Sequence, residues 1–294
     1  MYYWWAAKLA FRNLTGRAIA SRNLDIFPDD VFLVSYARSG STWMRFLVGN
    51  LVNPNDPVTF ASLEEKMPEI YLNTKKALDN HPRPRILTSH EPFDPRYKKL
   101  IYIVRDPRDV ALSYYHLQVK LRKFEEEYTI VQFLPRFFAG EFDTAGSWGE
   151  NVGSWLVARG NTSGFLLLRY EDVLRNTVQE LSKIALFLGV NADHERVERA
   201  VELSSADRMR SLEKKEPEGW KLLRGSRNDK SFVRLAASGG GLRELPESAI
   251  TAIESEWGPI MQELGYPLHT GRTVASPAFR GQFQPVVEQP VRGD

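Results

Sequence analysis

Short apolar runs alternate with longer amphipathic segments along most of the chain. Four runs are short and rich enough in Val, Ile and Leu to be buried strands: residues 31–36, 85–89, 100–104 and 164–169. Apolar side chains at helical spacing predict helices at 42–51, 108–119, from about 173 to 188, and at 193–203, 206–215 and 247–264. This alternation indicates an α/β protein with an open, mainly parallel sheet and helices on both faces.

The same pattern predicts one domain with two distinct ends. We expect a single domain over residues 28–268, because a chain of 294 residues can bury one large core. Residues 1–27 are expected to form a helical arm, which either packs on the domain or lies on a membrane surface. The Pro- and Gly-rich residues 269–294 predict a loosely ordered tail. Residues 217–245 look irregular, as a long lid or binding loop would.

Composition narrows the class of protein. Thirty-nine Lys and Arg against 37 Asp and Glu give a net charge of +2, which argues against a nucleic-acid partner. The absence of cysteine excludes disulfides, thiolate metal sites and a thiol nucleophile. We also find no apolar stretch long enough to cross a membrane and no signal peptide. The absence of cysteine is also compatible with a reducing cytoplasm, where we expect the protein. No acidic pair stands out as a magnesium site, so we expect that it uses no metal.

The turn after the first predicted strand has the composition of an anion-binding loop. Residues 36–43 read YARSGSTW and lead into the first long helix. Small residues let backbone N–H groups turn toward an anion, and the helix N-terminus adds partial positive charge. The hydroxyls of Ser39, Ser41 and Thr42 and the guanidinium of Arg38 would add donors. The alternative is an ordinary strand–helix turn that Ser41 merely caps.

This loop is not the Walker loop of nucleoside triphosphatases. Gly40 stands alone, and no Gly-Lys-Ser/Thr follows it. A small-molecule kinase is therefore a disfavoured reading of the chain.

Two further segments follow predicted strands and carry candidate chemistry. Residues 101–116 read IYIVRDPRDVALSYYH, so Arg105 ends a strand and Ser113 lies two turns along the next helix. The two side chains could hold one phosphate, or Arg105 could pair with a neighbouring aspartate, Asp106 or Asp109, at the surface.

The second segment, residues 88–92, reads TSHEP. A neutral imidazole at His90 could take a proton from an attacking hydroxyl, although a lone His after a strand is more often structural. Glu91 is a second candidate base.

Two of these motifs together resemble the sulfotransferase superfamily, which uses 3′-phosphoadenosine 5′-phosphosulfate (PAPS) and has a P-loop NTPase-like fold. The loop YARSGSTW is similar to the family's 5′-phosphosulfate loop, Y-P-K-S-G-T-T-W, and RDPRDVALSYYH is similar to its 3′-phosphate motif. They stand in the family's order, about 65 residues apart. The resemblance assigns donor binding to Arg38, Ser39, Gly40, Ser41, Thr42, Trp43, Arg105 and Ser113.

The resemblance also implies catalytic roles. Arg38 takes the place of the loop lysine that bridges the phosphate and the leaving oxygen. His90 matches the general base of the family's K-T-H-L-P segment, where Thr88 replaces the lysine. Trp43 would stack on the adenine.

Three more segments match the family's motifs less completely. Residues 167–172, LLRYED, resemble L-x-Y-E-D, which gives Tyr170 an adenine contact. Residues 203–209, LSSADRM, resemble T-S-F-x-x-M, which gives Ser204 a base contact and puts Ala206 where the family has an aromatic residue. Arg234 matches the closing loop R-K-G-x-x-G-x-W, although a register on Arg224 stays open.

The sequence therefore predicts a PAPS-dependent sulfotransferase that acts by in-line transfer to a hydroxyl or amine and releases 3′-phosphoadenosine 5′-phosphate (PAP). A donor-binding protein without catalytic activity is the alternative. The acceptor is open among small molecules, lipids and saccharides, and so is the oligomeric state. Six aromatic residues either line an acceptor pocket or belong to the core: Tyr71, Phe93, Phe133, Phe137, Phe138 and Trp148.

Overall fold

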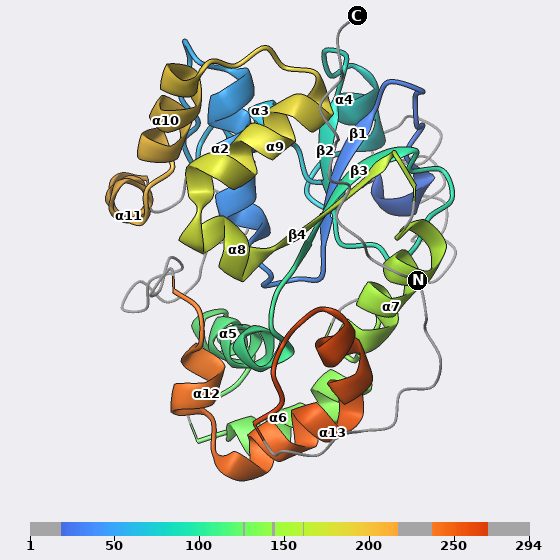
Figure 1. The fold of residues 1–294 in the computed structure, drawn as a ribbon, viewed down its shortest axis with the longest axis vertical. Coiled ribbons are helices and arrows are strands. Elements are labelled where there is room, and N and C mark those ends of the chain that lie inside the picture. Colours follow the sequence, from blue (N-terminus) through green and yellow to red (C-terminus); the bar gives the residue numbers. More distant parts are fainter. Residues whose placement is uncertain (1–18, 126, 143–144, 161, 217–236, 270–294) are drawn as a thin grey trace, which may run out of the picture.

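Four parallel strands form the centre of the molecule (Figure 1). The computed structural model describes residues 19–125, 127–142, 145–160, 162–216 and 237–269. The strands are β1 (Val31–Ser35), β2 (Ile86–Ser89), β3 (Lys99–Val104) and β4 (Phe165–Arg169), in the order β2-β1-β3-β4. Every pairing is parallel. The predicted fold class and all four predicted strands are confirmed.

The sheet is buried on both faces. Along β3, Leu100, Tyr102 and Val104 belong to one hydrophobic core, whereas Ile101 and Ile103 belong to the other. None of these five side chains is exposed. A strand covered on both faces has no polar alternation, which is why it appears in the sequence as an unbroken apolar run.

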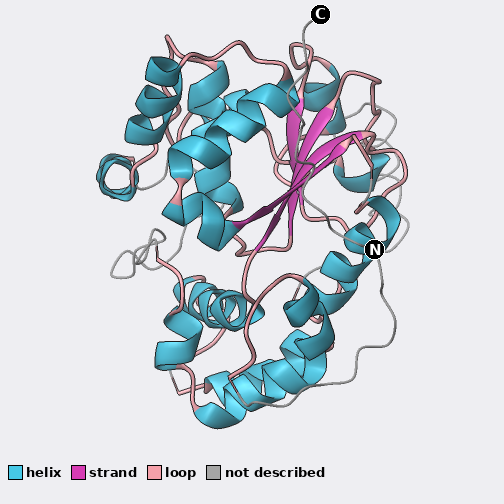
Figure 2. Ribbon diagram, in the orientation of Figure 1, coloured by secondary structure: helices cyan, strands magenta, loops and turns pink. Residues whose placement is uncertain are grey.

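Helices cover the two faces as two layers (Figure 2). One layer consists of α2 (Ser41–Val52), α3 (Leu63–Lys66), α8 (Tyr170–Arg175), α9 (Thr177–Leu188), α10 (His194–Leu203) and α11 (Ala206–Lys215). The other consists of α4 (Lys75–Asp79), α5 (Pro107–Lys120), α6 (Ile130–Phe138), α7 (Trp148–Arg159) and α13 (Glu247–Glu263). The short helix α12 (Gly240–Glu244) packs on α5.

Most helices that periodicity predicted are present within about two residues, but the stretch from about 173 to 188 is divided between α8 and α9, and other helices were missed. Both α6 and α7 begin with complete capping boxes, Thr129 with Gln132 and Ser147 with Glu150. Those boxes are a local signal that periodicity alone overlooks. Helix α12 lies inside the segment expected to be irregular, so that expectation was wrong for 240–244.

The chain packs onto the core from the first described residues. Ala20 and Leu24, on either side of the 3₁₀ helix η1 (Ser21–Asn23), are buried in the core. The Ala20 N–H donates to the Asn73 carbonyl at 2.9 Å. Most of the predicted arm (1–18) and nearly all of the predicted tail (270–294) lie outside the described residues, so the domain boundaries stay predictions. Among the residues described, no helix is both long and apolar enough to cross a membrane.

Candidate active site

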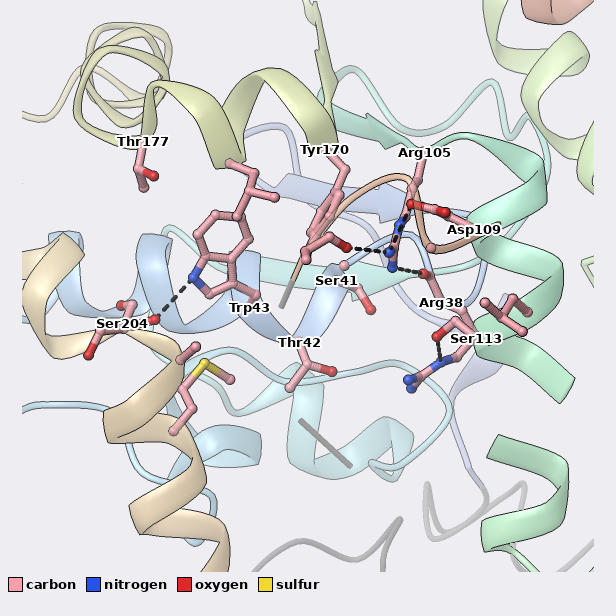
Figure 3. Close-up of a pocket in the computed structure, with 18 of the residues that line it drawn as sticks. Arg38, Ser41, Thr42, Trp43, Arg105, Asp109, Ser113, Tyr170, Thr177 and Ser204 are labelled. Atoms are coloured by element: carbon pink, nitrogen blue, oxygen red, sulfur yellow. Dashed lines mark hydrogen bonds and ion pairs between the residues drawn. The ribbon is translucent and has the colours of Figure 1, made fainter. Parts of the chain in front are cut away.

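One cavity opens at the carboxyl ends of β1 and β3, the edge where open α/β sheets bind ligands (Figure 3). Nine residues predicted to bind the donor line it: Arg38, Gly40, Ser41, Thr42, Trp43, Arg105, Ser113, Tyr170 and Ser204. Ser39 and His90 do not line it. The two alternatives for the closing loop, Arg234 and Arg224, lie outside the described residues.

The cavity has two walls, which differ in their position along the chain. We call Arg38, residues 40–43, Arg105 and Ser113 the sheet-edge wall. The lining residues of 237–244, namely Ala237, Gly240, Arg243 and Glu244, form the C-terminal wall.

The loop of the sheet-edge wall presents a helix N-terminus to the cavity. Gly40 is the N-cap of α2, and no side chain caps this end, so the first N–H groups of the helix can bind an anion. Ser41 therefore does not act as the cap of an ordinary turn. Arg38 has a φ of 70°, a left-handed conformation that costs a non-glycine residue about 1 kcal/mol and is found mainly at functional sites.

Gly40 is required by its surroundings. Its φ is 98°, and a Cβ atom there would lie 2.5 Å from the Tyr170 ring. Ser39 is the fully buried residue of the loop, and its N–H donates to the Tyr36 carbonyl at 3.2 Å. The Ser39 hydroxyl has no hydrogen-bond partner within the described part of the chain. The contribution of Ser39 to the loop is the backbone bond to Tyr36.

The two predicted anion anchors are in direct contact. Arg38 Nε donates to Ser113 Oγ at 3.2 Å, and Arg105 Nη1 donates to the Arg38 carbonyl at 3.4 Å. The sequence had placed them about 65 residues apart, and the parallel pairing of β1 with β3 brings them together. Positive charge from both motifs is thus concentrated at one end of the cavity.

Arg105 is held on several sides but keeps one donor unused. Its Nη2 donates to Asp109 Oδ2 at 3.3 Å and to the Ala237 carbonyl at 3.1 Å, and its guanidinium lies 4.3 Å above the Tyr170 ring. The alternative pairing with Asp109 therefore exists, but that carboxylate is 2% exposed and lines the cavity. The buried Arg105 Nε–H has no partner among the residues described. A phosphate oxygen would satisfy it.

The other end of the cavity is aromatic and apolar. Trp43 lies edge-on to Tyr170, with ring centroids 5.7 Å apart, and its Nε1–H donates to the Ser204 carbonyl at 3.0 Å. The Ser204 hydroxyl already donates to the Ala200 carbonyl at 2.7 Å and accepts from Asn50 at 3.0 Å. Ser204 thus holds Trp43 in place through its carbonyl.

Burial also fixes the state of Tyr170, because it raises the pKa of the phenol and keeps it neutral.

Sequence reasoning missed part of the lining. Leu174, Val201 and Met209, with Thr177, line the aromatic end, and Arg243 of α12 lines the C-terminal wall. The first four lie on helices that the periodicity located, but their direction depends on packing. Asp109 was visible in the motif RDPRD, although only as a surface partner.

His90 follows β2 at the same edge of the sheet. Its Nδ1 lies 2.7 Å from the Ser35 carbonyl oxygen, which can only accept, so this nitrogen carries the proton of the neutral ring. The lone pair then belongs to Nε2, which lies 3.8 Å from Glu69 Oε1. The Tyr71 ring is parallel to the imidazole at 6.1 Å. The tautomer is the one that a base acting through Nε2 requires.

The carboxylate of Glu91, the other candidate base, is already paired with an arginine. Its side chain is 2% exposed and forms an ion pair with Arg22, and its carbonyl accepts from Trp155 Nε1 at 3.0 Å. Thr88 is fully buried in β2. It therefore offers no cation in place of the lysine that the family carries at this position.

The six candidate acceptor aromatics divide into two groups. Phe133, Phe137 and Trp148 are fully buried in the core, so they do not line an accessible pocket. Phe138 packs edge-on against Trp257 at 5.2 Å. Phe93 is 37% exposed and packs edge-on against Trp155 at 5.4 Å. Tyr71 is stacked beside His90, the proposed base.

Comparison with known proteins agrees with this geometry. The family model for the sulfotransferase domain matches residues 28–253. Mouse sulfotransferase 1B1 is 32% identical over 199 residues, which cover 62% of this chain and 66% of that protein, just under two thirds. Guinea-pig 3-beta-hydroxysteroid sulfotransferase is 29% identical over 251 residues, covering 81% of this chain and 85% of that protein.

Solved structures share the fold. A mouse sulfotransferase complexed with PAP matches with a TM-score of 0.68 and 25% identity, over 84% of this chain and 89% of that one. Retinol dehydratase in complex with retinol and PAP has a TM-score of 0.67 at 22% identity, over 83% of this chain and 84% of that one. The family predicted from the two phosphate motifs is confirmed: the chain belongs to the sulfotransferase family.

Proposed function

We propose that this protein transfers a sulfuryl group from PAPS to the hydroxyl or amine of a small-molecule acceptor and releases PAP. One observation carries the proposal: a single cavity has an uncapped helix N-terminus and two arginines at one end and aromatic rings at the other. The donor combines two anionic groups with an adenine. Bound PAP in the related mouse structure supports the same choice.

The cavity offers a place for each part of the donor. The N-terminus of α2, Arg38 and the hydroxyls of Ser41 and Thr42 would hold the 5′-phosphosulfate. Arg105 and Ser113 would hold the 3′-phosphate, with the unpartnered Arg105 Nε–H as one donor. The adenine would lie at Trp43 and Tyr170, with Ser204 fixing the tryptophan.

Transfer would proceed in line. The acceptor oxygen forms a bond to sulfur while the bond between sulfur and the 5′-phosphate oxygen breaks, and the acceptor proton passes to His90 Nε2. The Ser35 carbonyl keeps the proton of the resting ring on Nδ1, and Glu69, 3.8 Å from Nε2, would stabilise the imidazolium. Arg38 would stabilise the charge on the leaving oxygen. With Thr88 in the lysine position, Arg38 carries more of this task.

Small hydroxyl compounds are the acceptors that we favour. The relatives include a 3-beta-hydroxysteroid sulfotransferase and an amine sulfotransferase from rabbit, and the retinol dehydratase structure contains retinol. A first panel should therefore contain a steroid alcohol, a simple phenol and a primary amine. A lipid and a saccharide would complete it.

Donor binding and catalysis can be tested on one preparation. PAP should raise the melting temperature of the protein, because a ligand that binds only the folded state stabilises it, and adenosine 5′-phosphate should do so much less. Sulfur-35 from labelled PAPS should then appear in at least one acceptor of the panel. Equal stabilisation by both nucleotides would contradict the 3′-phosphate assignment.

A donor-binding protein without activity is the second candidate, and Thr88 is the observation that favours it. The residue is buried and uncharged where the family has a cation near the transferring group. In this case PAP would stabilise the protein, but no acceptor would receive label. Restoring the charge with Thr88→Lys would distinguish a weak enzyme from a binder, since only the former should gain turnover.

A further inference from the structure

Apart from Arg243, the described residues that line the cavity hold too little positive charge for the donor proposed above. They include two arginines, Arg38 and Arg105, and the carboxylates of Asp109 and Glu244, so their formal charges cancel. A phosphate monoester alone carries about −1.5 to −2 at neutral pH, and the donor has a phosphosulfate besides. Arg105 also shares its charge with Asp109 at 3.3 Å. A further cation that can reach the 3′-phosphate is therefore needed.

Arg243 lies on the side of the cavity where that phosphate is expected. Helix α12 lies against the first two turns of α5, since a Cβ at Gly241 would be 2.5 Å from the Arg108 backbone and one at Gly240 would be 3.6 Å from Leu112. Ser113 projects from this same stretch of α5. The wall that carries Arg243 thus packs against the helix that carries Ser113, and its Ala237 carbonyl accepts from Arg105.

Arg243 and Arg105 donate to the carbonyls of adjacent residues. Arg243 Nη1 donates to the Ser238 carbonyl at 3.2 Å, so its guanidinium lies over residues 238–239. The residue before them, Ala237, accepts from Arg105 Nη2 at 3.1 Å. The N–H of Gly239 donates to Asp109 Oδ2 at 2.9 Å, the oxygen that also pairs with Arg105. Both guanidinium groups are therefore attached to one short piece of backbone.

The side chain of Arg243 is available for a ligand. It is exposed and lines the cavity, and its only bond in the described part of the chain is the one to the Ser238 carbonyl. That bond uses one of five N–H donors, which leaves a planar fork suited to a phosphate. An exposed arginine that merely faces solvent is the alternative.

We infer that Arg243 is a specificity-determining residue that binds the 3′-phosphate of the donor together with Arg105. The inference rests on the proposed function, because it concerns the same ligand. Arg243 would supply from α12 part of the charge that the family's closing loop supplies from its Arg-Lys-Gly. Its contribution should appear for nucleotides with a 3′-phosphate and vanish for those without one.

Calorimetric titration of the full chain with PAP and with adenosine 5′-phosphate tests this. Arg243→Ala should weaken PAP binding by about 10- to 100-fold, as expected for charge-assisted bonds to phosphate. Adenosine 5′-phosphate affinity should change less than twofold, and Arg243→Lys should recover part of the PAP affinity. Arg208→Ala removes another exposed arginine, next to the lining residue Met209, and should change neither affinity.

Two results would overturn the inference: unchanged PAP affinity in Arg243→Ala, or an equal loss for both nucleotides. A wild-type protein that fails to bind PAP would contradict the proposed function itself, which separates the two failures. Equal melting temperatures of the variants without nucleotide establish that the comparison is between folded proteins.

Discussion

The two walls of the cavity are held in place by different kinds of contact. In the sheet-edge wall, the positions of Arg38 and Arg105 follow from two neighbouring parallel strands and the turns after them. In the C-terminal wall, α12 is held by Asp109, which accepts from Gly239 at 2.9 Å and from Gly241 at 2.6 Å across about 130 residues of sequence. The first arrangement depends on the central sheet, and the second on the packing of α12 against α5 and on one buried carboxylate.

The difference suggests a division of tasks. Charges that act on the breaking bond need fixed geometry, which the buried sheet provides. Contacts that select the nucleotide can come from a separately fastened segment, because they need only reach the ligand once it is bound. Variants in the sheet-edge wall should therefore affect turnover most strongly, whereas those in the C-terminal wall should affect affinity and local stability.

The largest effect is expected at Arg38. Arg38→Ala should lower kcat/KM by about 10³- to 10⁵-fold, the range for an arginine that stabilises a phosphoryl-type transition state. Arg38→Lys, which restores the family's usual residue, should keep substantial activity. The measurement is steady-state transfer of labelled sulfur from PAPS. Near-normal turnover in Arg38→Ala would mean that the loop is structural.

His90→Ala should rank next, with a turnover lower by about 10²- to 10⁴-fold and almost unchanged PAP affinity. The reason is that the base contacts the acceptor proton and not the phosphates. Glu91→Gln keeps the size of a residue already paired with Arg22 and should be mild. Turnover of both variants on one acceptor, with PAP affinity measured by calorimetry, decides between them. An inactive Glu91→Gln beside an active His90→Ala would identify Glu91 as the base.

Gly40→Ala tests the rigidity of the sheet-edge wall. The substitution forces a Cβ into the Tyr170 ring and a left-handed φ on alanine, so we expect a loss of about 2–3 kcal/mol in unfolding free energy. Gly189→Ala is the matched control, because its φ is 75° and nothing lies within 4 Å of the added Cβ. It should cost only about 1 kcal/mol. Equal losses in urea unfolding would show that contact with Tyr170 does not matter.

The smallest expected effect is local and concerns the C-terminal wall. Asp109→Ala removes the acceptor of two backbone N–H groups, one of them on the buried Gly241, so α12 should open more often. Hydrogen exchange over residues 237–245 should rise by roughly 10- to 100-fold, since bonds to a charged acceptor are worth about 1.5–3 kcal/mol. Asp207→Ala, an exposed partner of Arg210, is the control and should leave exchange there unchanged. Unaltered protection in Asp109→Ala would show that α12 is held by other contacts.

Much of the site could be predicted because most of its functional residues lie in short, continuous segments of the sequence. Residues 36–43 place small residues, hydroxyls and an arginine between a strand and a helix, and that local order is enough to make an anion-binding turn. The pairing of Arg105 with Asp109 was also foreseen as an alternative. The location of Asp109 inside the cavity was not foreseen, because the order of residues along the chain does not show which of them are buried.

Ser204 shows the limit of residue-by-residue transfer. The resemblance assigns it a base contact, whereas in the fold its hydroxyl is bonded to Ala200 and Asn50 and its carbonyl supports Trp43. The direction of a small polar side chain depends on which donors lie around it. No motif contains that information.

The sequence by itself determined the strands, most of the long helices and the two phosphate motifs, because apolar runs, helical periodicity and turn composition act over a few residues. Tertiary structure alone decided that 240–244 forms a helix, that Arg243 and Arg105 bond to adjacent carbonyls, and that Phe133 and Phe137 belong to the core. Each of these outcomes depends on contacts between segments far apart in the chain. Such contacts are selected by packing and hydrogen-bond satisfaction in the folded molecule, which no local pattern specifies.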